Sequence, residues 1–474
     1  MAHYRRLTGA ALIAALCLGT HSAQAQGFEV ETGIDVFADP NTRIEGLHRL
    51  YVGHRVSPHF SFGQSIYSSA LGDAGGAFFW GFEGVAHIPL SQRLSLGLSG
   101  FVGGGGGAAQ VVGDGTMLRA GLSLDYRLSQ AWDLQLTSSW IRIAGAPIDD
   151  PAFGLGLRYR FGGTDTAPGS TPEFDDLAAV AMQLLPASGV RARSGGRQGS
   201  VSLVGVRAQF DVNERTQLSF SAAGAARGAQ GYMQIMGGAR RTFAMNRLSF
   251  FVEGRAGFAG GGDVDTGAGM LVGASAGVSL QVSHRFDVEL AFGGMTALDG
   301  DFRAGSVSLS LVRSFDRARA GGGGERWAFS TGLSAQTADA SFYLNPVGRD
   351  DYVAMQETSL DYFVGRRIYL TGNAQTTVAG GVSGYALGLV GLGYEMPLGD
   401  RWSLSVEGLL GAAGGGGVNT AGGIVAGLRA EVDYRVGDAW RLSMGLGQLA
   451  SVRSGGMSPT TVTLGVKIPF TTHR

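Results

Sequence analysis

One serine in the sequence has the neighbours of a hydrolase nucleophile. Residues Gly273 to Gly277 read Gly-Ala-Ser-Ala-Gly. They match the GxSxG pattern, which exposes a serine hydroxyl on a tight turn between a strand and a helix. Here the motif lies in the middle of a strand-like segment, and no helical pattern follows it. We therefore interpret Ser275 as an ordinary strand residue.

The histidines are the other groups that could act as catalytic bases. Four of them, His48, His54, His59 and His87, lie in the first third of the chain, and none recurs later at an equivalent position. An enzyme acting on membrane lipid would need a histidine beside a serine or carboxylate at the outer rim. His54 and His59 instead flank a short turn that the topology below places on the inner side. We predict no catalytic residue, no bound cofactor and no enzyme activity.

Metal ligation has one candidate segment. The carboxylates of Asp263-Val264-Asp265 could supply oxygen ligands to calcium. Only Asn419 is comparable elsewhere in the chain. We predict a solvated loop at this place and no metal site.

Three runs of glycine stand at equivalent places, namely Gly103 to Gly107, Gly260 to Gly262 and Gly414 to Gly417. A phosphate-binding loop would need a following helix N-terminus and usually a lysine, and neither is present. Missing side chains also permit strong strand coiling or the close approach of another chain or barrel. We favour that interpretation and expect the runs to be exposed in loops outside the cell.

The composition narrows the class of protein. Hydrophobic residues make up 44% and charged residues 16%, and 81 of the 474 residues are glycine, well above the usual share of about 7%. This is neither a disordered nor a helical composition. No basic block is present, which argues against a nucleic-acid partner.

The N-terminus has the pattern of a secretory signal. Arg5 and Arg6 precede an apolar run, and Ala23-Gln24-Ala25 forms a small-residue cleavage site, so we predict a signal peptide over residues 1–25. The only cysteine, Cys17, lies inside it, and the mature chain is therefore expected to have neither a disulfide nor a lipid anchor. Beyond residue 26 no apolar stretch reaches 18 residues, which excludes a membrane-spanning helix.

An internal repeat divides the rest of the chain. Arg93-Leu94-Ser95-Leu96 recurs in similar form at an offset of 154 residues and again at twice that offset. The same register aligns glycines and aromatic residues, in the sets Gly100, Gly254 and Gly408, then Gly106, Gly260 and Gly414, then Gly115, Gly269 and Gly423, and finally Trp132, Phe286 and Trp440. We predict three repeats over residues 27–163, 176–315 and 327–470, with linkers at 164–175 and 316–326.

Each repeat is expected to contain eight strands. In residues 132–140 apolar and polar side chains alternate with period 2, as on a strand with two different environments. Segments of about ten residues suffice to cross a bilayer when tilted, and short and longer connections alternate between them. The segment Asp176–Leu185 could form a helix capped by Thr171, but an even strand count favours a strand. A water-soluble β-sandwich is the alternative, and the apolar outer faces argue against it.

In this pattern the chain resembles the small eight-stranded outer-membrane barrels of Gram-negative bacteria. The ends of two repeats look like the C-terminal signal of such proteins, with Gly156, Tyr159 and Phe161 in the first and Gly465, Ile468 and Phe470 in the third. The second repeat ends in Phe315 without the glycine. The resemblance implies an outer-membrane location and insertion by the barrel-assembly machinery.

Three repeats could close as tandem barrels or as one barrel of about 24 strands. Tandem closure would bring Glu29, Glu31 and Asp35 beside Arg158 and Arg160, where opposite charges pair in a narrow interior. A single ring would place Glu29 near Lys467, which also pairs. Small inward residues such as Gly273, Ser275, Gly277 and Ser279 argue against narrow barrels, and the absence of a plug argues against the ring. We favour the tandem arrangement.

Two classes of function fit such a protein. The first is a non-enzymatic envelope protein with a structural or surface-assembly role. The second is a channel for passive permeation or for export of a polymer such as polysaccharide. Outer-membrane lipid is the expected partner, together with a surface polymer or another envelope protein.

Overall fold

The computed structural model describes residues 28–39, 43–109, 111, 113–160, 175–315, 325–347, 349–437 and 440–472. The predicted signal peptide, Phe161 and the linker at 164–174 lie outside these residues. So do positions 316–324 of the second linker, whereas Glu325 and Arg326 already belong to a strand. The described residues contain no helix long and apolar enough to cross a membrane.

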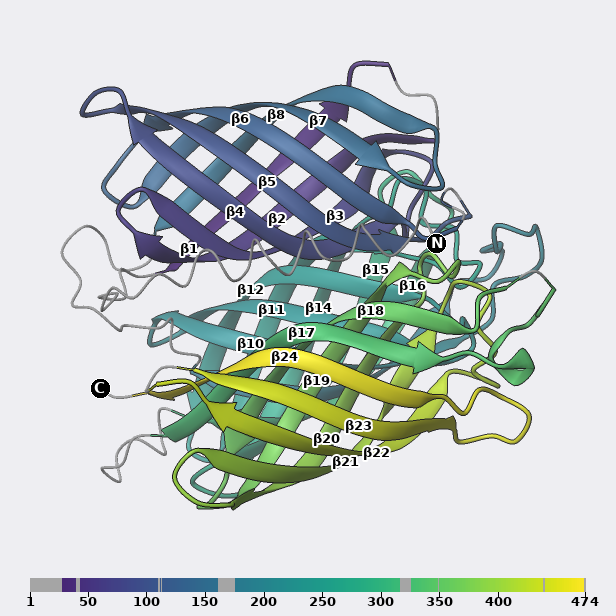
Figure 1. Ribbon diagram of the computed structural model, residues 1–474. Coiled ribbons are helices and arrows are strands. Elements are labelled where there is room, and N and C mark those ends of the chain that lie inside the picture. The colour runs from purple at the N-terminus through teal and green to yellow at the C-terminus, as the bar shows by residue number, and fades with distance from the viewer. Residues whose placement is uncertain are drawn as a thin grey trace.

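The described strands form three closed antiparallel barrels of eight strands each, and among these residues no strand pairs with a strand of another barrel (Figure 1). Barrel 1 consists of β1 Phe28–Phe37, β2 Ile44–Ser57, β3 Phe60–Gly72, β4 Phe78–Pro89, β5 Leu94–Gly106, β6 Thr116–Arg127, β7 Trp132–Ile143 and β8 Ile148–Arg160. Barrel 2 consists of β9 Asp176–Pro186, β10 Val201–Asn213, β11 Thr216–Arg227, β12 Met233–Met245, β13 Leu248–Gly260, β14 Met270–Gln281, β15 Phe286–Ala297 and β16 Arg303–Ser314. Barrel 3 consists of β17 Glu325–Thr337, β18 Tyr352–Phe363, β19 Ile368–Ala379, β20 Ala386–Pro397, β21 Trp402–Gly414, β22 Ile424–Arg435, β23 Arg441–Ser451 and β24 Thr460–Thr472.

The tandem arrangement is therefore confirmed and the single large ring is wrong. The first and last strands of barrel 1 pair directly, with Glu29 opposite Arg160 and Glu31 opposite Arg158. The ambiguous segment after the first linker is strand β9, which closes barrel 2 between β10 and β16. Closure leaves no strand with unpaired backbone groups at a sheet edge, a condition for spanning the lipid core.

Each strand presents one face to the surroundings and one to the barrel interior. On β7, Leu136 and Trp140 point outward with exposed fractions of 61% and 53%, whereas Asp133 and Gln135 are buried inside. The same division of apolar outer and polar inner residues holds in barrel 2, where Leu311 is exposed and Glu289 is buried, and in barrel 3, where Leu464 is exposed and Lys467 is buried. This is the inverse of a water-soluble protein and is the pattern of a barrel in lipid.

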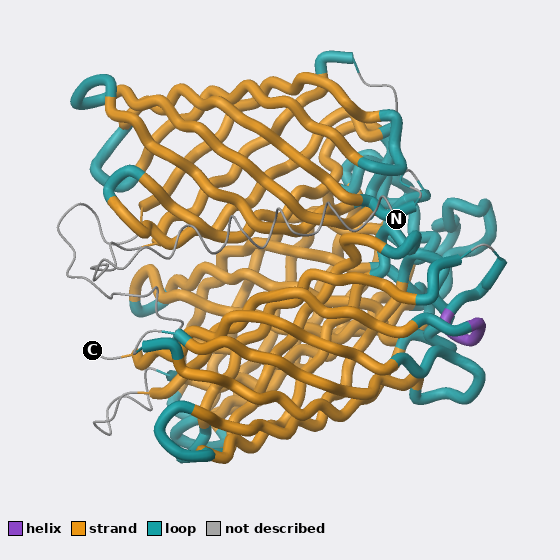
Figure 2. The backbone as a smooth tube through the Cα atoms, in the orientation of Figure 1, coloured by secondary structure: helices purple, strands orange, loops and turns teal. Residues whose placement is uncertain are grey.

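The three barrels lie side by side, and their longer loops gather at one end (Figure 2). Turns at the opposite end are short, such as residues 58–59 and 246–247, whereas loops 187–200 and 338–351 are the longest. Strand β8 begins at Ile148, because Ile148 continues the ladder opposite Ile143, and the loop between β7 and β8 therefore covers only residues 144–147.

The first glycine run is not an exposed loop, which corrects the prediction for that run, whereas the other two runs begin at the last residue of a strand, Gly260 and Gly414, and continue into loops. Gly103 to Gly106 belong to β5, pair with β4 as far as Phe78, and are buried. A Cβ added at Gly105 would lie 1.9 Å from the carbonyl oxygen of Phe78. The carbonyl oxygen of Gly105 accepts a hydrogen bond from another barrel, as described below.

The orientation of the barrels gives a first testable prediction. Val347, which is 84% exposed in the loop between β17 and β18, should after replacement by cysteine react with an impermeant maleimide on intact cells. Ser129→Cys, in the short turn between β6 and β7, should react only once the envelope is opened. The reverse pattern of labelling would invert the topology.

Candidate functional site in the barrel interiors and the seams between barrels

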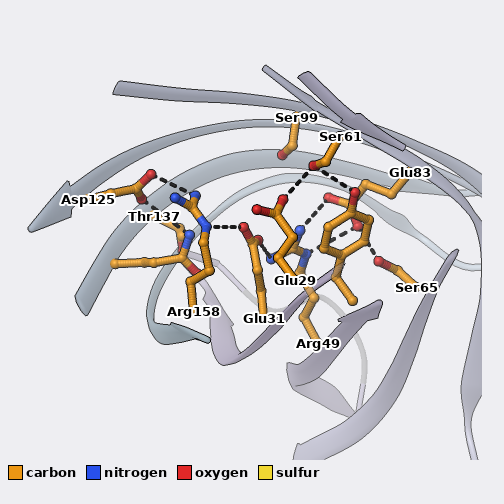
Figure 3. A network of polar contacts seen from close by, with 12 residues as sticks. Glu29, Glu31, Arg49, Ser61, Ser65, Glu83, Ser99, Asp125, Thr137 and Arg158 are labelled. Atoms are coloured by element: carbon orange, nitrogen blue, oxygen red, sulfur yellow. Dashed lines mark hydrogen bonds and ion pairs between the residues drawn. The ribbon is translucent and has the colours of Figure 1, made fainter. Parts of the chain in front are cut away.

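The interior of barrel 1 is filled by a network of paired charges (Figure 3). Arg158 donates to Glu31 at 2.7 Å and to Asp125 at 2.7 Å. Arg49 donates to the other oxygen of Glu31 at 2.6 Å and to Glu83 at 2.9 Å. Of the predicted charges, Glu31 and Arg158 thus meet, whereas Glu29, Asp35 and Arg160 pair with other residues of the same interior, and Arg49 and Glu83 extend the network.

Further ion pairs lie in the same interior, beside this network. Arg119 donates to Asp35 at 3.0 Å, and Arg160 pairs with Asp133. The large rings of Tyr51 and Tyr67 occupy the space between the charged groups and are fully buried. The lumen of barrel 1 is therefore occupied by its own side chains.

The interior of barrel 2 is also occupied by its own side chains, fewer of which are charged. Glu289 accepts from Arg240 at 2.7 Å and from Arg207 at 2.5 Å. The guanidinium of Arg240 lies 3.6 Å from the centroid of the Phe251 ring, a cation–π contact. A Cβ added at Gly277 would lie 2.5 Å from the Phe251 ring. The small residues of β14 thus make room for long side chains from neighbouring strands, and the expected difficulty in filling a narrow barrel does not arise.

Barrel 3 contains two linked clusters. Arg429 pairs with Glu357 and, at 2.7 Å, with Glu407. Lys467, the only lysine of the chain, pairs with Glu431 and, at 3.2 Å, with Asp433. Lys467 thus pairs within its own barrel, and the contact with Glu29 that a single ring would require is absent from the described residues.

Two of the outer mouths are covered by loops. In barrel 3, residue Asp339 caps the short helix η1, Ala340–Phe342, and hydrogen bonds from the Ser341 hydroxyl and backbone lower the pKa of its carboxyl. Phe342 is buried against Tyr385, and burial raises the pKa of the adjacent Tyr343 phenol. In barrel 2, Ser194 in loop 187–200 donates from both its amide and its hydroxyl to Asp263. Asp263, considered above as a calcium ligand and assigned to a solvated loop, thus anchors loop 187–200.

The remaining candidates for chemistry are separated from one another. Ser275 lies in the middle of β14, between strands β13 and β15, as predicted. His48 is on the outer face of barrel 1, where it contacts the Thr32 hydroxyl at 2.8 Å and stacks on Phe258 of barrel 2. His87 faces the interior, 3.1 Å from Glu29. These residues do not form a common site.

The glycine runs form the seams between barrels, a role that the sequence indicated only as the approach of another barrel. Gly384 of barrel 3 donates its amide to Gly105 of barrel 1 at 3.0 Å, and the Ser383 amide donates to Gly113. Gly75 of barrel 1 donates to Gly267 of barrel 2 at 2.7 Å. Backbone thus packs directly on backbone at both seams.

The seams repeat in cyclic order from barrel 1 to 2, from 2 to 3, and from 3 to 1. In each, the third strand of one barrel approaches the fifth strand of the next, in the pairs β3 with β13, β11 with β21, and β19 with β5. The glycine that ends each fifth strand would clash with the neighbouring barrel if it carried a Cβ, at 2.8 Å for Gly106, 2.3 Å for Gly260 and 2.7 Å for Gly414. A head-to-tail contact that closes after three units makes a ring. The three barrels therefore form a pseudo-threefold trimer within one chain.

A second set of contacts joins barrels 2 and 3 at the other end. Phe315, Trp327 and Tyr362 form a buried aromatic cluster, with the rings of Trp327 and Tyr362 at 4.7 Å. Arg313 donates to the Tyr362 hydroxyl at 2.8 Å. Phe315, which ends the second repeat without its expected glycine, thus packs on the start of barrel 3.

Comparison with known proteins gives no family. No family model and no curated protein matches the chain. Among solved structures, the siderophore receptor PirA from Acinetobacter baumannii is 11% identical over 94% of this chain and 80% of its own, with a TM-score of 0.30. OccAB4 from the same organism is 9% identical over 95% of this chain and 100% of its own, with a TM-score of 0.24. A designed transmembrane β-barrel matches 31% of this chain at 14% identity, with a TM-score of 0.22. Similarities of this size carry no information about function.

The fold itself defines the class. Closed barrels with an apolar outer face, a charged and buried interior and long loops at one end are those of a bacterial outer-membrane β-barrel protein.

Proposed function

We propose that this protein is a non-enzymatic structural component of the bacterial outer membrane, which holds three occluded barrels together and presents their loops for assembly at the cell surface. The observation that supports this proposal is the filling of the lumens. The central charged residues, Arg158, Glu289 and Arg429 among them, are buried and paired with groups of their own barrel. Insertion by the barrel-assembly machinery and association with a surface polymer or another envelope protein belong to the same proposal.

The alternative function, passive permeation or polymer export, needs a wide water-filled lumen. An eight-stranded barrel has an interior just wide enough for side chains to fill, whereas porins of 16–18 strands leave an aqueous channel. The paired charges inside each barrel occupy that space. We therefore expect no solute path through an individual barrel.

Conductance tests this proposal directly. The full-length protein, reconstituted in a planar lipid bilayer, is expected to show no steady ion current. As a positive control, the triple variant Arg240→Ser, Phe251→Ser and Glu289→Ser removes the central charged and aromatic side chains of barrel 2, while the buried apolar cluster nearer its outer mouth remains. This variant should pass more current than the unmodified protein, provided that its gel mobility remains heat-modifiable, the sign of a closed barrel. A steady current from the unmodified protein would favour the channel instead.

A further inference from the structure

Arg241 is a charged side chain on the outer face of barrel 2. It follows Arg240 in β12, and because Arg240 points into the barrel, Arg241 points to the surroundings. It is exposed, and among the described residues it has no hydrogen-bond or ion-pair partner. Arg313, also outward, differs because Tyr362 of barrel 3 accepts its hydrogen bond. A lipid-facing arginine is unfavourable in hydrocarbon, and at the interface it can pair with an anionic group.

The level of Arg241 in the membrane follows from the strand register. Its neighbour on β11 is Thr216, the first residue of that strand after the short turn at 214–215. Arg241 therefore lies near the rim that carries the short turns, on the periplasmic side. The Thr216 side chain is on the same outer face, since residues opposite each other on neighbouring strands share a face. A guanidinium and a hydroxyl at this level could both donate to a lipid phosphate.

A groove of about 600 Å³ extends from Arg241 along the outer face of barrel 2. Its floor consists of small outward residues, Ala239, Gly254, Ala274 and Ala276, and Phe292 lies at its side. A Cβ added at Gly254 would have no atom within 4 Å. The floor is thus a depression in the outer face, apolar and suited to an acyl chain.

We propose that this groove binds one anionic glycerophospholipid of the periplasmic leaflet, with its phosphate at Arg241 and Thr216 and an acyl chain over Gly254. The proposal rests on the placement of the barrels in the outer membrane. The positive charge of Arg241 favours an anionic lipid, because an arginine without a protein partner at the end of an apolar groove complements a negatively charged headgroup. The position near the short turns selects the inner leaflet over the outer one.

Native mass spectrometry of the full-length, delipidated protein with added phosphatidylglycerol tests this site. One phosphatidylglycerol molecule should bind more tightly than the rest. Both Arg241→Gln, which removes a charge-assisted contact, and Gly254→Leu, which fills the groove, should weaken the binding of this molecule about tenfold or more. Gly254→Leu should leave the fold intact, because the added side chain meets open space.

Two matched controls accompany these variants. Gly100→Leu, at the equivalent position of barrel 1, also meets no atom within 4 Å, and Arg303→Gln removes an exposed arginine at the opposite end of barrel 2. Both should keep the tight adduct. An adduct that survives Arg241→Gln and Gly254→Leu, or one that the controls weaken equally, would overturn the site. The gel mobility and conductance of the same samples report on the fold and the proposed function separately.

Discussion

Replacing Arg158 by methionine should lower the stability of barrel 1 by about 3–5 kcal/mol, the cost of breaking a buried ion pair by removing one partner. Arg158 is 3% exposed and lies between Glu31, Asp125 and Asp133. Without the guanidinium, Asp125 would lose its cationic partner in a space that water hardly reaches, whereas Glu31 and Asp133 would keep Arg49 and Arg160. The measurement is urea unfolding of the full chain in lipid vesicles, followed by tryptophan fluorescence and by loss of the heat-modifiable band.

A matched control separates this effect from a general loss of positive charge. Arg127 ends β6 at the rim with the short turns and is exposed, so Arg127→Met should change the unfolding free energy by less than about 0.5 kcal/mol. Adding Asp125→Asn to Arg158→Met should restore part of the loss, because Asp125 is the carboxylate that loses its only cationic partner among the described residues. Equal effects of the Arg158 and Arg127 substitutions would show that the interior network does not stabilise the barrel.

The closure of barrel 1 could be predicted because side chains on paired strands carry complementary charge. Glu31 and Arg158 are inward residues of the first and last strands, and only closure after eight strands places them together. The two faces of β7 could also be predicted from the sequence, because alternation with period 2 assigns Trp132 and Leu136 to one side. Both patterns are properties of a strand and its immediate partner.

The filling of barrel 2 could not be predicted for a physical reason. The sequence of β14 shows only that Gly277 has no side chain. The space beside Gly277 is filled by Phe251, which comes from β13. Arg240, which stacks on Phe251, comes from β12. Which neighbour reaches across a glycine depends on the tilt of the strands and on rotamers, and neither is a property of a local pattern.

The seams were hidden for a related reason. A glycine that touches backbone of another barrel leaves no charge or apolar pattern that identifies its partner. The repeat register did mark the relevant positions, because Gly106, Gly260 and Gly414 are equivalent and each contacts the neighbouring barrel. Their interpretation as exposed loop residues was wrong because strand β5 and its equivalents extend as far as these glycines, which are buried by contact with the neighbouring barrel.

Gly414→Val should open the seam between barrels 2 and 3 while each barrel remains closed. A Cβ at Gly414 would lie 2.7 Å from the amide nitrogen of Gly231, and backbone at that distance must move, whereas a flexible side chain could turn away. Overpacking of this kind costs about 1–3 kcal/mol. Gly414 does not have the positive φ of Gly106, so the substitution adds no strain of its own and the effect reports on the seam.

Hydrogen–deuterium exchange of the full chain in detergent measures this opening. Exchange in Gly414→Val should increase in residues 227–232 and 414–423, on the two sides of the seam, while the strands of barrels 2 and 3 keep their protection. Gly408→Val is the control, because Gly408 is on the same strand and face and its Cβ would come no nearer than 4.0 Å to the side chain of Leu428. Unchanged exchange at the seam in Gly414→Val, or an equal rise in Gly408→Val, would mean that the glycine ring does not hold the barrels together. A rise confined to the seam would show that three closed barrels are joined at their outer rim by backbone contact, which in a membrane is the contact that small residues permit.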